Sequence, residues 1–259
     1  MLIKTRIKSS IRSQTITNKM KISLGVLTVL IALTVSKRLP SNFKICDHFA
    51  PNLNECLYDA VLSALHQMKN GLREIDAPPL DPVIIPNATI EKGEFTINFN
   101  DIHVYNVTDA VIHKINATAT TERFYATMFA GVEEILGVMN YNLKGKLLLF
   151  TIDGGGKAII RFKNITFDMV LDGEVVEKNG APHYSLTSFS VKLDPKLITF
   201  DMQDIFRERK DLTEAFNIAL NQNWDVFFGE TQAEFEEILS QFFMQYANNV
   251  FKYVPVQTQ

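Results

Sequence analysis

The chain has 259 residues, of which 46% are apolar and 21% charged, with two cysteines and a formal net charge of −3. This composition excludes a wholly disordered chain, a miniprotein built on several disulfides, and a polytopic membrane protein with long apolar runs throughout. Residues 1–36 hold six basic side chains and no acidic one, so 20 of the 26 basic and all 29 acidic residues fall in 37–259, giving that part a net charge of −9. Because phosphate binding needs clustered Lys and Arg, the acidic excess argues against nucleic acid as a partner.

An uncharged apolar run of fourteen residues, Ile22–Val35, follows a basic segment near the start of the chain. As a helix it would span roughly 21 Å, short of the ~30 Å hydrocarbon core of a bilayer. The run therefore predicts a signal peptide over residues 1–36, with an extended basic n-region or a true start at Met20, cleaved near Ser36. A retained signal anchor is the alternative. We expect a secreted, extracellular monomer whose single domain covers residues 37–259 and which has no stable membrane span after cleavage.

Two further features indicate export to an oxidising compartment. Four Asn-x-Thr glycosylation sequons begin at Asn87, Asn106, Asn116 and Asn164. Cys46 and Cys56 are the only cysteines. A single disulfide between them is the economical interpretation, and closing so short a loop contributes about 2–3 kcal/mol. A reactive thiol or a metal site is the alternative, but no partner residues stand at ligand spacing.

The first helix of the exported domain is predicted to begin at Asn52. Glu55 stands where a capping box needs its acidic residue, and apolar residues recur at helical spacing through Leu72. The helix should end near Gly71, because a proline-rich segment follows from Pro78.

From Ala88 to about Phe200 the apolar residues alternate with a period of two, which predicts β-strands. A turn signal at residues 178–180 separates two such runs and predicts a hairpin. Short connections without long helices between strands indicate an antiparallel sheet. Residues 154–156 are three successive glycines before Lys157, which we expect to form a tight turn or bulge, since the spacing and following residue do not match a phosphate-binding loop.

The end of the chain is predicted to be helical, with an apolar stripe from Phe216 to Phe227 and a longer one from Phe235 to Val250. Nine of the nineteen phenylalanines fall in residues 200–259, so the last helix should bury a broad aromatic face. Four acidic residues near its predicted start should interact favourably with the positive end of the helix dipole. These are Glu230, Glu234, Glu236 and Glu237. We interpret the adjacent pairs Glu133–Glu134 and Glu236–Glu237 as solvated faces.

No catalytic constellation is visible in the sequence. There is no Gly-x-Ser-x-Gly motif, no cysteine left to pair with a histidine, and no His-Glu-x-x-His pattern among the five scattered histidines. The chain is therefore predicted to be non-enzymatic, without a metal or cofactor.

Several motifs taken in order resemble the insect takeout-like and haemolymph juvenile-hormone-binding protein family. They cover about residues 44–256. The motifs are the pair Cys46 and Cys56, the Leu80-Asp81-Pro82 element, the run from Tyr141 through Gly145 to Gly154 and Gly156, Phe216-Asn217, Asn221-Gln-Asn223-Trp224, and Val254-Pro255. The hormone carriers of this family have a second cysteine pair, which is missing here, so the resemblance favours the takeout-like branch.

The resemblance implies an α+β fold in which a highly curved antiparallel sheet wraps a long C-terminal helix, a tubular lipid-binding fold of the super-roll type with an internal apolar tunnel. It also implies a carrier or sensor of a small hydrophobic ligand, such as a terpenoid, a fatty acid or a related lipid. Two alternatives are a secreted interaction protein with a filled tunnel that binds a receptor or a microbial surface, and a signal-anchored lipid transfer protein.

Candidate tunnel-lining residues follow from the apolar stripes of the predicted strands and last helix. They are Met128, Phe129, Met139, Tyr141, Trp224, Phe235, Leu239, Phe242 and Phe243. Tyr141 and Trp224 could each donate a hydrogen bond to a ligand. We expect unfilled volume alongside Phe242 and Phe243, where the aromatic stripe is densest.

Overall fold

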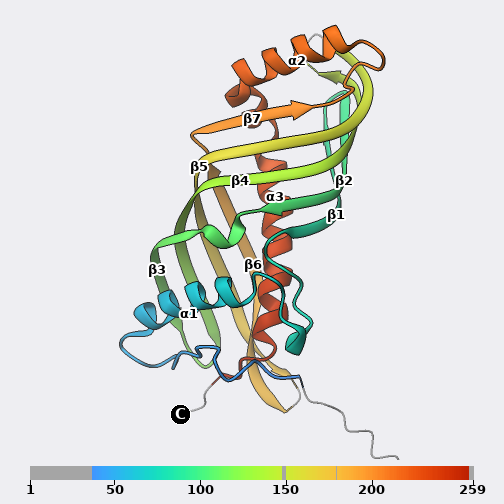
Figure 1. Ribbon diagram of the computed structural model, residues 1–259. Helices are drawn as coiled ribbons and strands as arrows, with labels where there is room; N and C mark the ends of the chain where they lie inside the picture. The colour runs from blue at the N-terminus through green and yellow to red at the C-terminus, as the bar shows by residue number, and fades with distance from the viewer. Residues whose placement is uncertain (1–36, 148–149, 179, 257–259) are drawn as a thin grey trace, which may run out of the picture. The chain divides into compact units, whose positions relative to one another are not determined.

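The computed structural model describes residues 37–147, 150–178 and 180–256, so the predicted signal peptide lies outside the described residues. The helices are α1 (Leu53–Gln67), α2 (Lys210–Gln222) and α3 (Trp224–Phe251), and short 3-10 turns lie at Arg73–Ile75 and Val107–Asp109 (Figure 1). The strands are β1 (Val83–Lys92), β2 (Phe95–Tyr105), β3 (Val111–Ala119), β4 (Arg123–Leu147), β5 (Phe150–Lys178), β6 (Ala181–Asp194) and β7 (Leu197–Met202). The predicted α+β class is confirmed.

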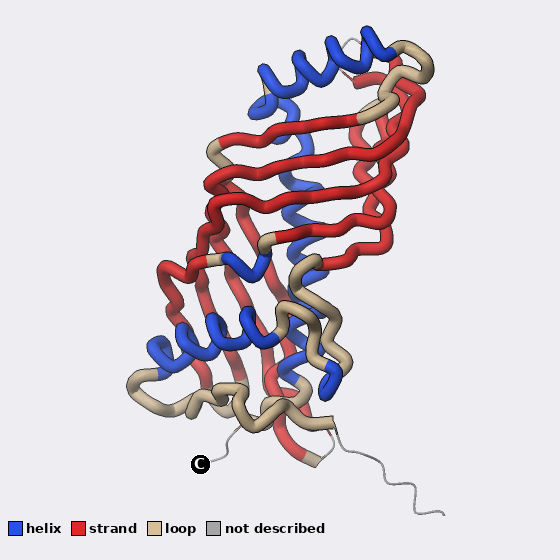
Figure 2. Tube along the Cα trace, in the orientation of Figure 1, coloured by secondary structure: helices blue, strands red, loops and turns tan. Residues whose placement is uncertain are grey.

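The strands form one antiparallel sheet built around the long strands β4 and β5. These two pair along their whole lengths, from Arg123↔Glu174 to Leu147↔Phe150. On its other edge β4 pairs first with β3 and then with β2, and β1 pairs with β2. The other edge of β5 pairs first with β7 and then with β6. The two long strands β4 and β5 therefore each change neighbours partway along their length, which can be followed in Figure 2.

Irregularities in pairing let the sheet curve around α3. The register shifts between Asn100 and His103 in β2, between Ile112 and Lys114 in β3, and between Asp172 and Gly173 in β5. Extra residues of this kind bend a strand and increase its twist. The 28 residues of α3 make a rod about 42 Å long, and the sheet wraps around it (Figure 1). The predicted arrangement of a long C-terminal helix wrapped by a curved antiparallel sheet is confirmed.

The two turns predicted within the sheet have different outcomes. The hairpin at residues 178–180 is confirmed, because Lys178 pairs with Ala181 and Gly180 has a φ of +77°. The turn or bulge expected at residues 154–156 is wrong, because these glycines lie inside β5 and pair with β4. A Cβ on Gly154 would stand 1.8 Å from the carbonyl oxygen of Ile205. The glycines therefore let the segment after β7 lie directly against the backbone of β5.

The first helix is confirmed, but it ends at Gln67 rather than near Gly71, and its capping box is not formed. Asn52 precedes α1 with φ −99° and ψ 26° and makes no side-chain capping bond. An N-cap side chain reaches the helix N–H groups from an extended backbone, which Asn52 does not have. The predicted disulfide is confirmed, since Cys46 and Cys56 are joined with their Cα atoms 5.8 Å apart. It ties the segment before the helix to the first turn of α1.

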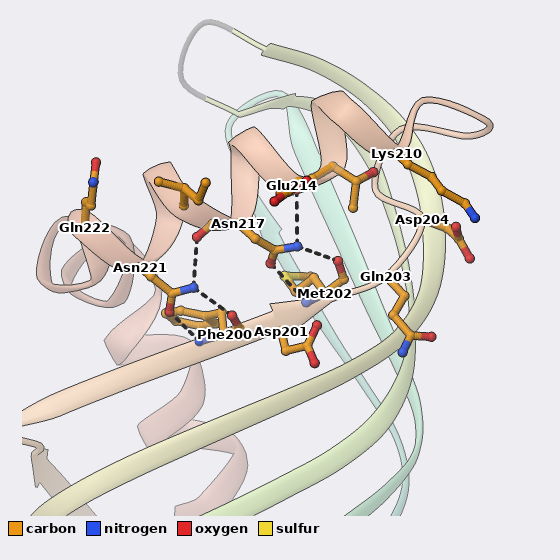
Figure 3. A pocket seen from close by; sticks show the side chains of 12 residues that line it. Phe200, Asp201, Met202, Gln203, Asp204, Lys210, Glu214, Asn217, Asn221 and Gln222 are labelled. Atoms are coloured by element: carbon orange, nitrogen blue, oxygen red, sulfur yellow. Dashed lines mark hydrogen bonds between the residues drawn. The ribbon is translucent and has the colours of Figure 1, made fainter.

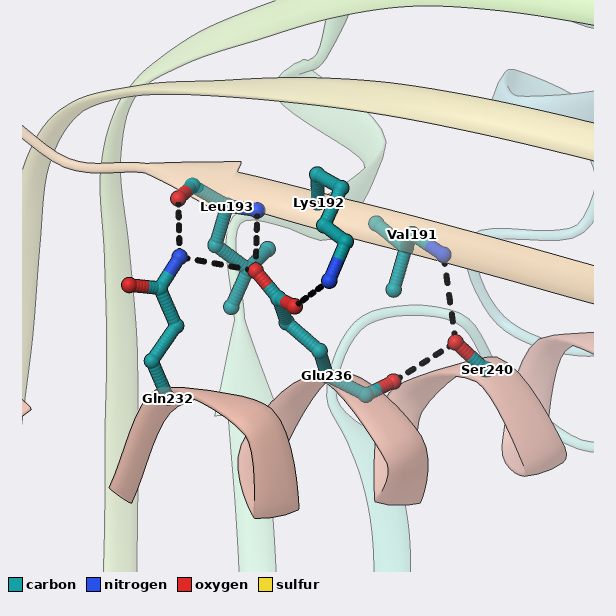
Figure 4. Close-up of polar contacts among 6 residues, drawn as sticks. All are labelled: Val191, Lys192, Leu193, Gln232, Glu236 and Ser240. Carbon is teal, nitrogen blue, oxygen red and sulfur yellow. Dashed lines mark hydrogen bonds and ion pairs between the residues drawn. The ribbon is translucent and has the colours of Figure 1, made fainter. Parts of the chain in front are cut away.

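Polar side chains of α3 bond the free edge of β6, as Figure 4 shows. The Glu236 carboxylate accepts hydrogen bonds from the backbone N–H of Leu193 at 3.0 Å and from Lys192 Nζ at 2.6 Å. Ser240 Oγ accepts one from the N–H of Val191 at 3.1 Å. Gln232 Nε2 donates to the carbonyl oxygen of Leu193 at 2.9 Å and to Glu236 at 2.8 Å. The helix thus satisfies backbone groups that an edge strand would otherwise leave unpaired.

The solvated face expected for Glu236 is therefore wrong, since this residue is only 5% exposed. Burial acts to raise the pKa of Glu236, but the hydrogen bonds from Lys192, the Leu193 N–H and Gln232 outweigh it and lower the pKa below its ordinary value. The prediction that four glutamates from Glu230 to Glu237 lie near the start of the last helix is also wrong. The helix begins at Trp224, so Asp225 is the acidic residue of its first turn.

The C-terminal half of α3 packs on one side against segments that lie mostly outside the strands, and on another side against the sheet. Phe242, Tyr246 and Val250 pack against a buried cluster formed by the end of α1 and the chain that leads into β1. That cluster consists of Met68, Leu72, Ile75, Ala77, Leu80 and Val83. Met244, Ala247 and Phe251 pack on a second cluster, which is formed by residues of β4 and β6 together with Val256 beyond the end of the helix.

Candidate functional site

Two neighbouring cavities lie between the N-terminal half of α3 and the sheet. Cavity A, of about 100 Å³, lies at the α2 end of the helix and is bordered by β1, β2, β4, β5, β7, α2 and the first turns of α3. Cavity B, of about 110 Å³, lies further along the helix beside Ile238 and Leu239. For scale, an engineered apolar cavity of about 150 Å³ accommodates benzene. Each cavity alone is thus smaller than a terpenoid or a fatty acid.

The two cavities meet at a ring of shared side chains, which we call the neck. Phe99 of β2, Ile160 and Phe162 of β5, and Phe235 of α3 border both cavities. The ring centres of Phe99 and Phe235 are 6.3 Å apart. Phe228 adjoins the neck from the side of cavity A, with its ring centre 6.1 Å from that of Phe162. The internal space is therefore one row of two chambers along the helix.

The lining of both chambers is almost wholly apolar. All sixteen residues that border cavity B are apolar or glycine. Fifteen of the seventeen around cavity A are apolar, and the exceptions are Glu230 and Thr231. The Thr231 hydroxyl donates to the carbonyl oxygen of Phe227 at 3.1 Å. Such surroundings offer water few partners and suit an apolar guest.

The lining includes part of the set predicted from the sequence. Met139 and Leu239 border cavity B, and Phe235 borders both cavities. Trp224, the first residue of α3, is half-buried against the core and borders neither cavity. These residues lie on the helix and strand faces that the apolar stripes predicted, but only some of them reach the unfilled space.

The hydroxyl of Tyr141 already donates a hydrogen bond within the protein, so the predicted hydrogen bond from Tyr141 to a ligand does not match the geometry. Its hydroxyl donates to the backbone carbonyl of Gln203 at 2.6 Å, and the residue borders neither cavity. Burial raises the pKa of Tyr141 well above its ordinary value. This hydroxyl fastens the segment after β7 to β4.

Met128 and Phe129 lie in the part of β4 that pairs with β3, away from both cavities. Phe129 is 37% exposed and its ring lies 5.2 Å from that of His113. Phe242 and Phe243 border neither cavity either, because Phe242 packs on the cluster after α1 and Phe243 stacks on Phe189 at 6.0 Å. The unfilled volume expected beside them lies nearer the start of the helix.

The cavity-lining side chains of β5 are not among those predicted from the sequence. Ile160 and Phe162 border cavity B, and so do Ile165 and Phe167. A strict alternation would place these two pairs on opposite faces of the strand. Asn164, whose φ is +47°, lies between them at a break in the pairing with β4 that leaves the register unchanged, and the alternation resumes after it on the same face. The spacing of three residues between Phe162 and Ile165, which breaks the alternation of apolar residues, is the sequence signal that could have indicated this arrangement.

A surface groove of about 750 Å³ lies between β7 and α2. Figure 3 shows its two central amides, Asn217 and Asn221, directed at the backbone of β7. Asn221 accepts from the Phe200 N–H at 2.7 Å and donates to the Phe200 carbonyl at 2.8 Å. Asn217 does the same for Met202 at 3.0 and 2.8 Å. These amides close the edge of β7, which is a structural role.

A metal site in the described part of the chain would need side chains that could bind the ion together. No group of three or more His, Cys, Asp or Glu side chains among these residues could hold a metal ion. Within the same residues, no helix combines the length and the apolar character that a membrane crossing requires.

Burial raises the pKa of Tyr246, whose hydroxyl donates to the Pro78 carbonyl at 2.9 Å and so anchors α3 to the loop after α1.

The four sequons lie in different surroundings. Asn87, Asn116 and Asn164 are exposed, whereas Asn106 is half-buried. The Thr108 hydroxyl of the Asn106 sequon is buried and donates to Asp81 at 3.2 Å. Exposure therefore favours Asn87, Asn116 and Asn164 over Asn106 for glycan attachment.

Comparison with known proteins identifies the fold and the family. The family model described as haemolymph juvenile hormone binding protein (JHBP) matches residues 25–258. The circadian clock-controlled protein daywake of Drosophila melanogaster is 23% identical over 243 residues, covering 90% of this chain and 92% of that protein. Daywake of Drosophila yakuba is 23% identical over 235 residues, covering 86% and 88%. The crystal structure of Epiphyas postvittana Takeout 1 matches with a TM-score of 0.71 at 19% identity, covering 82% of this chain and 97% of that one. The chain belongs to the haemolymph juvenile hormone binding protein family.

Proposed function

We propose that the protein is a secreted, non-catalytic carrier or sensor of a small hydrophobic ligand, such as a terpenoid, a fatty acid or a related lipid. The observation that carries this proposal is the pair of adjoining apolar chambers along α3. Membership of a family named for binding juvenile hormone in haemolymph supports a ligand of this class. Each square ångström of apolar ligand surface removed from water contributes about 25 cal/mol, so such a site needs few polar contacts.

The leader, the sequons and the disulfide support secretion. The Cys46–Cys56 bond requires an oxidising compartment to form and persist. Cleavage of the leader is tested by N-terminal sequencing of the protein collected from the medium of insect cells. A mature N-terminus near Ser36 is expected, and a protein retained in the membrane fraction with residues 1–36 intact would support the signal-anchored alternative.

Ligand binding is tested with the fluorescent probe N-phenyl-1-naphthylamine and by native mass spectrometry of the protein purified from the medium. We expect saturable probe binding and copurified lipid that organic solvent extracts. Leu239→Trp should fill cavity B and weaken probe binding at least fivefold, because Leu239 borders that cavity. Ile218→Trp is the matched control, since Ile218 is 52% exposed on α2 and borders neither chamber.

The interaction-protein alternative makes the opposite prediction for the same experiment. If the interior only completes the core, the probe should not bind saturably, and no lipid should copurify. Binding to cells or to a microbial surface that persists after lipid extraction would then favour that alternative.

A further inference from the structure

Two of the four side chains of the neck, Phe162 of β5 and Phe235 of α3, are only half-buried, and Phe235 is the one carried by the helix. Ile160 and Phe99 are 3% and 4% exposed, so they are fixed in the core. Phe235 is only half-buried although it points inward, because it has unfilled volume on both sides. Its ring centre lies 6.3 Å from that of Phe99 and 6.5 Å from that of Phe228, near the upper end of the usual 4.5–7 Å range for aromatic pairs.

The backbone that carries Phe235 is held firmly. The next residue, Glu236, is bonded to the Leu193 N–H and to Lys192 on β6. The helix therefore stays in place at this position, and rotation of the ring about its side-chain bonds is the available motion. Cavity A or cavity B can receive the ring when it turns, since both border it.

We propose that Phe235 is a movable partition that sets the length of ligand the protein accepts. A short apolar molecule occupies one chamber with the ring in place, and a longer one turns the ring aside and occupies both. The proposal rests on the proposed function, and it adds a residue that determines specificity and a shape for the ligand.

The neck also limits the class of ligand. A passage formed by three aromatic rings and Ile160 suits a narrow, flexible acyl or open-chain terpenoid tail better than a fused ring system. The tail must be apolar where it lies in cavity B, because no polar side chain borders that cavity. The polar end lies at cavity A, beside Thr231 and Glu230 and next to Val226, which is 53% exposed.

The test compares chain-length profiles of the wild type and variants. Straight-chain alcohols from hexanol to tetradecanol are used to displace N-phenyl-1-naphthylamine from the intact exported protein. While each added methylene is buried, affinity should rise up to about fourfold per carbon. In Phe235→Trp the rise should stop at a shorter chain, because the bulkier ring cannot turn aside. In Phe235→Leu it should continue at least as far as in the wild type, and the longest alcohols should gain relative to the shortest.

Phe243→Trp and Phe243→Leu are the matched controls, since Phe243 lies two turns further along the same helix and borders neither chamber. Their profiles should follow the wild type, and thermal unfolding checks that every variant is folded. Identical length profiles in the wild type and both Phe235 variants would overturn the partition while leaving the carrier function in place. If the wild type binds neither the probe nor any alcohol, the carrier function itself fails and the partition fails with it.

Discussion

The two halves of α3 are buried in different ways. Along the first half, up to about Leu239, the helix faces the sheet and α2 across two chambers. Along the second half, Phe242, Tyr246 and Val250 meet side chains from the end of α1 and the chain leading into β1. The same aromatic stripe therefore borders unfilled volume at one end of the helix and packed core at the other.

The difference shows where a curved sheet leaves space. Where a sheet wraps a helix at a distance, side chains from other segments can fill the space between them. In the packed half, Ile75 and Leu80 come from outside the strands and are almost completely buried. In the cavity half, the strands and the helices are the whole lining. We infer that the chambers follow from the absence of such a filling segment, and three predictions test this comparison.

The largest expected effect is on the packed half. Ile75→Ala should lower the free energy of unfolding by about 2–5 kcal/mol, because Ile75 is 0% exposed and its loss leaves a new void. Leu239→Ala removes a similar volume beside a void that already exists, and should cost less than half as much. Urea unfolding at pH 7 measures both. Equal losses would contradict the distinction between a packed and an unfilled half.

A second prediction reverses the change by adding volume. Ala88 borders cavity B, whereas Ala126 is buried in the cluster that includes Val256. Ala88→Leu should stabilise the protein by about 0.5–1 kcal/mol, since it fills an existing cavity. Ala126→Leu should destabilise it by about 1–3 kcal/mol through overpacking. Thermal unfolding measured on both variants checks the signs, and a loss of stability in Ala88→Leu would mean that cavity B is not available space.

How far the sequence predicts this arrangement depends on the range of the interactions. The period of apolar residues is local, so the helices and the alternation of Phe95, Ile97 and Phe99 in β2 are predicted correctly. The face that a strand presents is not local. It depends on irregularities such as the one at Asn164, which interrupts the alternation in β5 and brings Phe162 and Phe167 to the same cavity. The family resemblance supplied the curvature of the sheet, which no local pattern encodes.

Glu236 shows a second limit of sequence reasoning. A glutamate beside another glutamate is usually exposed, and its partner, the Leu193 N–H, lies 43 residues away in the chain. The available signal is a series of polar residues at a spacing of four, Gln232, Glu236 and Ser240, on a face that is otherwise apolar. Recognising its meaning requires knowing that an unpaired strand edge lies opposite, which only the tertiary structure shows.

The smallest expected effect concerns the contact that holds the helix to β6 between the two halves. The hydrogen bonds to Glu236 lower its pKa, so the stability they contribute is present above the ordinary glutamate pKa of about 4.3 and is lost as the pH falls through the lower value in the folded protein. Glu236→Gln removes this charge. It should cost about 1 kcal/mol at pH 7, because a neutral amide makes weaker hydrogen bonds to the Leu193 N–H and Lys192.

The pH dependence distinguishes this role from simple loss of a side chain. Urea unfolding of the wild type and Glu236→Gln at pH 7, 5, 4 and 3 should show the difference shrinking as the pH falls below the ordinary glutamate pKa of about 4.3, because the unfolded state then binds a proton that the folded carboxylate resists. Glu237→Gln is the matched control, since Glu237 is exposed and its change should stay within about 0.5 kcal/mol at every pH. A constant difference across the series would mean that the charge of Glu236 does not hold the helix. If the difference shrinks as expected while probe binding to the chambers weakens in Glu236→Gln, the same contact that fixes α3 on the sheet also keeps the unfilled half in shape.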